Sequence, residues 1–161
     1  MVTIGDVLGI VAFLTGLGGT GWAMTVAMGL LFPDQTLRAS ESTKGAFVRG
    51  LVPLLALVVG LVMLSAPVPG LKLLGWVVVL GVMALGALGL AGLSHVAGRR
   101  LTALQPEMGE YPAFLRGAGF LVSASLFPVL GWFLFAPVAF IVALGAGLSG
   151  VSRRQTVALE A

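Results

Sequence analysis

The stretch that decides the fold is FLRGAGFLVSASLFPVLGWFLFAPVAFIVALGAGLSGVSRR, residues 114–154. As one helix, its apolar part would be about 51 Å long at 1.5 Å per residue, whereas the hydrocarbon core of a bilayer is about 30 Å thick. Pro128 and Gly131 interrupt the apolar run. Proline lacks a backbone N–H and glycine permits turn conformations, so we expect a break there. The stretch then forms a helical hairpin with limbs at 112–127 and 129–150.

An earlier stretch, residues 47–100, repeats this pattern. Both stretches open on Phe-x-Arg-Gly, carry a Gly-Trp pair after a proline, and close on Arg-Arg. We expect a hairpin here too, with limbs at 50–66 and 73–98 joined by a tight turn at 67–70. The uncharged run 7–32 precedes both and is long enough to span a bilayer. The sequence predicts an all-α integral membrane protein: one transmembrane helix plus two repeated helical hairpins, giving four to five membrane segments.

Composition supports a single membrane domain over residues 1–161. The chain is 58% hydrophobic and 9% charged, and its mean hydropathy is +1.10. A soluble domain has about 45–50% apolar and about 25% charged residues, so this chain has too little polar surface to face water alone. The absence of cysteine excludes disulfides, thiolate metal sites and cysteine nucleophiles.

Basic residues are distributed unevenly around the predicted spans. If the N-terminus is outside and the final stretch is a hairpin, eight of the nine Lys and Arg residues are cytoplasmic and Lys72 alone is outside. A single final span would put Arg153 and Arg154 outside, giving six against three. Because cytoplasmic loops carry an excess of Lys and Arg, we expect an outside N-terminus and a cytoplasmic C-terminus. The same bias explains the net charge of +3 without a nucleic-acid partner.

Short motifs along the chain carry a resemblance to a known family. They are Leu31-Phe32-Pro33 followed by Arg38, Arg49-Gly50, Pro67–Gly70, Phe127–Trp132 and Leu144–Gly147. Together they resemble a bacterial polytopic membrane module that often follows a bactofilin-like, polymer-forming β-domain; these 161 residues contain no β-domain. The resemblance implies a multi-pass fold in the bacterial inner membrane and supplies no catalytic residues.

The sequence contains no pattern typical of catalysis or metal binding. All six acidic residues fall in predicted loops or at the termini. Charged residues inside a span usually mark proton or ion paths, so their absence weighs against a pump or coupled transporter. Walker loops, nucleophile elbows and HExxH motifs are also missing. We therefore predict that the protein is not an enzyme.

His95 is the one candidate cofactor ligand. Ala91 and Ala87 precede it by four and eight residues, which places all three on one helix face. Ala-x-x-x-His resembles the bacteriochlorophyll-ligating pattern of light-harvesting helices, where a small residue leaves room for the macrocycle. His95 also lies four residues before Arg99, close to the predicted cytoplasmic boundary. We expect an interfacial histidine without a cofactor, with a tetrapyrrole-binding subunit (bacteriochlorophyll or haem) as an alternative function.

Small residues point to close helix packing. Glycine and alanine let neighbouring helices approach closely in a bilayer, and Ser or Thr hydroxyls bond across helices or to their own backbone. The candidate helix-packing residues are Gly21, Thr25, Gly29, Ala87, Ala91 and Gly147. We predict an accessory or scaffold subunit that packs against other integral membrane proteins, or against itself, through such faces. A small oligomeric channel or transporter is the remaining alternative.

Overall fold

The computed structural model of the chain describes residues 4–127 and 129–159. Within these residues the chain is helical and contains no strand. The helices are α1 (Ile4–Leu31), α2 (Pro33–Glu41), α3 (Ala46–Ser65), α4 (Pro69–Leu104), α5 (Glu110–Ser125), the π-helix η1 (Gly131–Phe135) and α6 (Ala136–Leu159).

Four helical segments are long and apolar enough to cross a membrane. They are Ile4–Leu31, Ala46–Ser65, Pro69–Leu104 and Gly131–Ser152. The predicted all-α chain with several potential membrane spans is therefore confirmed at this level. The remaining long helix, α5, has 16 residues and is about 24 Å long, which is less than the thickness of a hydrocarbon core.

Prolines and glycines set the ends of the helices. Ala66 has the extended conformation typical of a residue before proline, and α4 then begins on Pro69 in its first turn. The final apolar stretch is also interrupted: α5 ends at Ser125, and η1 begins at Gly131. Gly131 is buried at this corner, where a Cβ atom would lie 2.5 Å from the Ala124 carbonyl oxygen. Pro128, the other predicted breaker, lies outside the described residues.

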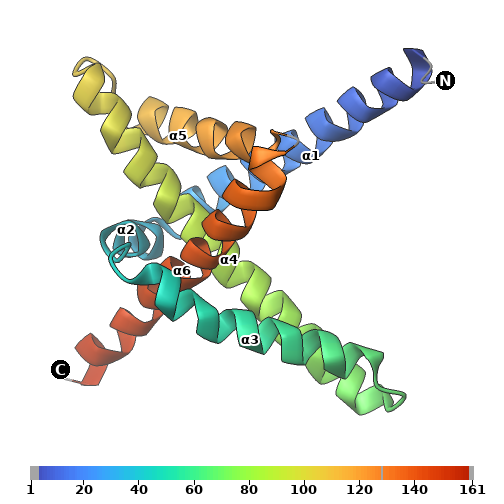
Figure 1. The fold of residues 1–161 in the computed structure, drawn as a ribbon. Coiled ribbons are helices and arrows are strands. Elements are labelled where there is room, and N and C mark those ends of the chain that lie inside the picture. Colours follow the sequence, from blue (N-terminus) through green and yellow to red (C-terminus); the bar gives the residue numbers. More distant parts are fainter. Residues whose placement is uncertain (1–3, 128, 160–161) are drawn as a thin grey trace.

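Helix α4 is the centre of the arrangement (Figure 1). α3 and α6 pack against it and against each other, α5 packs along it, and α2 lies between α4 and α6. In Figure 1 the N-terminal end of α1 and the α3–α4 turn lie to one side, and α2, the α4–α5 connection and the C-terminal end lie to the other. α5 packs mainly against α4, and α6 packs mainly against α3 and α4, so α5 and α6 contact other helices more than each other. Their equivalence to α3 and α4 as a second, repeated hairpin stays a prediction.

The core consists of helix crossings through small residues. A Cβ at Gly89 of α4 would overlap the Ala143 carbonyl of α6, and a Cβ at Gly50 of α3 would overlap the Ile141 carbonyl of α6. Where α4 meets α5, a Cβ at Gly98 would lie 2.8 Å from the carbonyl oxygen of Ala113. Such contacts bring backbones together, which is how helices associate in lipid.

Candidate functional site

The first candidate site is helix α1, whose inner face is occupied within the chain. Gly18, Thr25 and Gly29 are buried, and a Cβ at Gly29 would overlap the Phe114 ring of α5. Nearby, the indole Nε1 of Trp22 donates a hydrogen bond to the Leu115 carbonyl, 3.1 Å away. Thr25 and Gly29 therefore pack inside the chain, and the predicted face that includes them is not free for a partner.

An exposed face of α1 carries a second row of small residues, of which Gly5 and Gly9 also border an open cavity lined by Leu126 and Trp132. These residues recur at alternating steps of four and three, and they are all exposed. They are Gly5, Gly9, Ala12, Gly16, Gly19 and Ala23, which we call the outer seam. A Cβ built at Gly9, Gly16 or Gly19 would have no atom within 4 Å. Most exposed positions of α3 and α4 are different, because they carry large side chains such as Leu55, Val62 and Val77.

Sequence reasoning missed the outer seam, although the sequence contains its signal. The four-residue spacing of Gly21, Thr25 and Gly29 indicates the inner face alone. Alternating steps of four and three average 3.5 residues, the period of a left-handed helix pair. Scanning α1 for that period separates the two faces.

The other predicted packing residues lie at the central crossing. Ala87 and Ala91 of α4 are buried, with exposed fractions of 6% and 0%. Gly147 of α6 is also buried, and a Cβ there would overlap the Leu85 carbonyl. Gly21 is partly buried and borders a cavity between α1 and its neighbours. These residues hold the chain's own helices together.

The cavity beside Gly21 has a volume of about 480 Å³ and is enclosed by α1, α4, α5, η1 and α6. Three hydroxyls line it, those of Thr25, Ser94 and Ser125. Each donates to the carbonyl four residues earlier in its own helix, at 2.8 to 2.9 Å. None of the described residues lining the cavity is charged. This lining gives no support to an ion path.

A second cavity, of about 400 Å³, contains His95 and is called here the His95 cavity. The imidazole of His95 stacks on the Phe114 ring, with centroids 4.3 Å apart and planes at 22°. Arg99, Glu110 and Tyr111 also line the cavity. His95 thus occupies an amphipathic pocket where α1 ends and α5 begins.

Two arginines form hydrogen bonds that link the α2 region to the other helices. The Nη1 atom of Arg49 donates to the Ser149 hydroxyl of α6 at 2.6 Å, and Nη2 donates to the Ser42 carbonyl at 2.9 Å. The Nη2 atom of Arg99 donates to the Ser40 hydroxyl of α2 at 2.6 Å. Charge-assisted bonds of this kind are stronger than neutral ones, so these arginines have a structural role.

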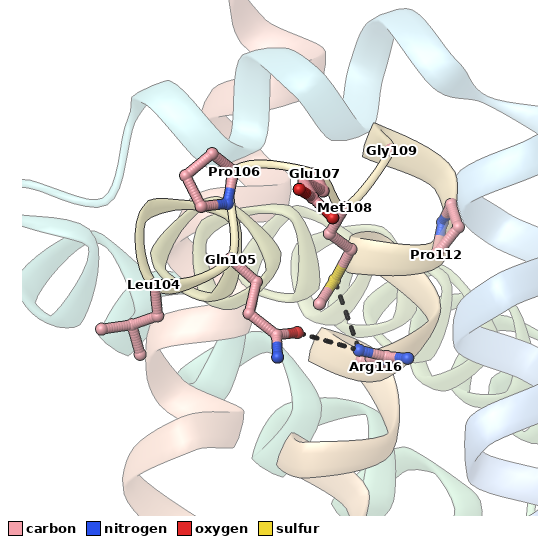
Figure 2. Close-up of a pocket in the computed structure, with 8 residues that line it drawn as sticks. All are labelled: Leu104, Gln105, Pro106, Glu107, Met108, Gly109, Pro112 and Arg116. Carbon is pink, nitrogen blue, oxygen red and sulfur yellow. Dashed lines mark hydrogen bonds between the residues drawn. The ribbon is translucent and has the colours of Figure 1, made fainter.

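A third cavity lies in the connection between α4 and α5 (Figure 2) and has a volume of about 590 Å³. Arg116 points toward this connection, with Nη1 3.4 Å from Gln105 Oε1 and 3.8 Å from Met108 Sδ. Glu107 also lines the cavity. Within the described residues, no group of three or more His, Cys, Asp or Glu side chains is placed to hold a metal ion.

Comparison with protein-family models, with curated proteins and with solved structures finds no match for this chain. The resemblance to a module that follows bactofilin-like domains therefore stays a prediction.

Proposed function

We propose that the chain is a non-enzymatic, multi-pass subunit of a bacterial inner-membrane assembly, and that it packs against a transmembrane helix of another subunit through the outer seam of α1. Four helices of suitable length and hydropathy support the membrane location. The exposed row of small residues from Gly5 to Ala23 carries the packing part of the proposal.

The distribution of charge supports an outside N-terminus. Lys72 lies in the first turn of α4, beside the α3–α4 turn, on the side of Figure 1 where the N-terminal end of α1 lies. α2 and the α4–α5 connection lie toward the opposite side of Figure 1, and these regions with the helices that flank them carry six basic residues. They are Arg38, Lys44, Arg49, Arg99, Arg100 and Arg116. Positive charge favours the cytoplasmic side, so we place α2 and the α4–α5 connection there.

Close packing is what the outer seam provides. In lipid, apolar side chains have no hydrophobic drive to leave their surroundings, so helices associate through dispersion contacts and close backbone approach. A row of glycine and alanine permits that approach along the first two thirds of α1, from Gly5 to Ala23. Its 3.5-residue period fits the left-handed crossing of about 20° that most transmembrane helix pairs adopt.

The test replaces two seam glycines by leucine, Gly9→Leu with Gly16→Leu. Leucine favours membrane insertion, so the double variant should insert as the wild type does. Added bulk in a packed contact costs about 1–3 kcal/mol per site, so association should fall by at least about tenfold. Association is measured with a photo-crosslinking residue at Leu8, a large and exposed residue beside the seam, so that the probe adds no bulk within it. The mass of the crosslinked product distinguishes a second copy of this 16.4 kDa chain from another subunit.

The matched control is Gly81→Leu. Gly81 is an exposed glycine of α4 that likewise has no atom within 4 Å of a built Cβ, and it lies outside the seam. This variant should crosslink like the wild type. Equal crosslinking by the seam variant and the wild type would show that α1 does not carry the contact. Leucine at Gly21 and Gly29 would be a poorer test, because Gly29 packs against Phe114 within the chain.

A further inference from the structure

The His95 cavity has a polar side and an apolar side. His95, Arg99 and Thr102 of α4 and Glu110 and Tyr111 of α5 provide the polar groups. The apolar wall comes from the end of α1 and the start of α2, where Leu30 and Leu37 are 57% and 46% exposed. A ligand of this cavity must therefore have a polar head and an apolar body.

The polar side carries one charge of each sign, and the two are not joined. Arg99 and Glu110 both line the cavity, yet no ion pair links them in the described part of the chain. Arg99 donates one bond to Ser40, and its guanidinium has five N–H donors in all. The Glu110 carboxylate interacts electrostatically with His95, and it makes no hydrogen bond or ion pair with a described residue. The cavity thus offers a cationic donor and an anionic acceptor to one ligand.

We propose that the His95 cavity binds the head group of a zwitterionic phospholipid with a primary ammonium, as in phosphatidylethanolamine. The phosphate accepts hydrogen bonds from Arg99, since guanidinium geometry suits phosphate oxygens. The ammonium donates to the Glu110 carboxylate, a bond that the quaternary ammonium of phosphatidylcholine cannot make. An acyl chain runs along Leu30 and Leu37. This inference rests on the membrane location proposed above.

Charge complementarity selects this class of lipid over an anionic one. A phosphatidylglycerol head would bring a negative charge beside Glu110 with no cation to offset it. A phosphoethanolamine head places one charge opposite each of Arg99 and Glu110. The cavity also lies where lipid head groups lie, because Arg99 follows the apolar part of α4 and Glu110 begins α5.

The experiment places the purified protein in nanodiscs with equal amounts of phosphatidylethanolamine, phosphatidylglycerol and phosphatidylcholine. Native mass spectrometry then measures which lipid stays bound after the disc is removed. We expect phosphatidylethanolamine to be retained about tenfold over each of the others, the selectivity that one charge-assisted hydrogen bond gives. Phosphatidylglycerol enrichment, or equal retention of all three, would overturn the assignment.

Substitutions of Glu110 and Arg99 test the ammonium end and the phosphate end of the head group separately. Glu110→Gln should abolish the preference for phosphatidylethanolamine while the phosphate end is still held. Arg99→Gln should lower the retention of all three lipids. Because Arg99 also bonds to Ser40, Ser40→Ala serves as a second variant that removes this bond and keeps the guanidinium. It should retain lipid like the wild type, and a loss as large as that of Arg99→Gln would mean that the arginine acts only on the fold.

Matched controls come from neighbouring charges. Arg100→Gln and Glu107→Gln change exposed residues of the same sign that do not line the His95 cavity. Both should keep the wild-type lipid preference, and a loss of preference in either would contradict the site. Alkaline extraction of the membranes tests the proposed location separately. Release of the protein by alkali would refute the membrane subunit, whereas retention without lipid selectivity would refute the lipid site alone.

Discussion

Single glycines determine how closely these helices approach, and their contacts differ sharply along one helix. Gly89 and Gly81 are both in α4, but a Cβ at Gly89 would overlap the Ala143 carbonyl and a Cβ at Gly81 meets nothing within 4 Å. A methyl group should therefore lower the stability of the protein at Gly89 and should not lower it at Gly81. This contrast gives a direct measurement of close packing.

We predict that Gly89→Ala destabilises the protein by about 1–3 kcal/mol, because α4 and α6 must move apart to relieve the overlap. Gly81→Ala should be neutral or stabilise by up to about 1 kcal/mol, since alanine restricts the unfolded chain. Denaturant unfolding in mixed detergent micelles, followed by tryptophan fluorescence, measures both. A Gly89→Ala protein as stable as Gly81→Ala would show that α4 and α6 do not touch there.

His95 allows a second test at the scale of one residue. We predict that His95→Gln leaves the visible absorption spectrum and the yield of the protein purified from its native membrane unchanged. The imidazole of His95 stacks on the Phe114 ring, so we expect it to pack within the chain and not to ligate a tetrapyrrole. A tetrapyrrole absorption band in the wild type that disappears in this variant would instead establish the cofactor-binding alternative.

Among the elements, α5 and the corner that follows it are the most unusual. α5 is about 24 Å long, and η1 restarts the helix with a π turn. π turns widen a helix locally and are uncommon. If α5 starts at the cytoplasmic surface, its far end falls short of the opposite face of a core about 30 Å thick.

This shortfall predicts a difference in labelling between two corners. A cysteine at Val68, in the α3–α4 turn, should react readily with an impermeant thiol reagent added outside. A cysteine at Leu130, in the α5–η1 corner, should react more slowly with the same reagent. Labelling rates on intact cells measure the difference. Equal rates would mean that the corner reaches the outer surface and that α5 spans the membrane.

Much of the element order could be predicted from the sequence, because prolines and long uncharged runs act locally. The break before Gly131 follows from backbone chemistry alone, as does a turn between α3 and α4. That turn is shorter than predicted, because Pro69 and Gly70 form the first turn of α4 and only residues 66–68 connect the helices. Which helices of the chain pack against each other could not be predicted in the same way. The apolar runs indicate that each helix packs against some apolar neighbour. Which helix α5 contacts depends on where small residues of different helices meet, as Gly98 of α4 meets Ala113 of α5. The π turn at η1 has no local signal that we can name.

The His95 cavity likewise could be predicted only in part. His95 was identified as a single conspicuous residue, but Arg99, Glu110 and Tyr111 join it only through the crossing of α4 and α5. Glu110 comes from a different helix, fifteen positions away in the chain. The periodicity of α1 predicts a face of small residues, but it does not tell whether other helices of this chain or a partner cover that face. Only the packed structure distinguishes the covered face of α1 from the exposed one.

For the whole molecule, the orientation in the membrane is the central prediction. Cysteines at Asp34 and at Ala161 should both be protected from an impermeant reagent, and one at Val68 should be labelled. The reason is the separation of basic residues, with Lys72 alone on the proposed outer side. Permeabilised cells provide the control in which all three react. Labelling of Ala161 in intact cells, with Asp34 protected, would show that the final stretch crosses the membrane once.

The glycine crossings described above also determine how this protein can evolve. Where helices meet backbone to backbone, as at Gly50 and Gly89, no larger residue fits and no second substitution restores the contact. On the exposed faces other than the outer seam, one apolar residue can replace another with little effect. A saturation mutagenesis scan should therefore divide the chain into two classes with few positions between them. Homologues would vary freely on the exposed faces outside the outer seam and keep the glycine positions, so divergent members would share a spacing of glycines more than a sequence.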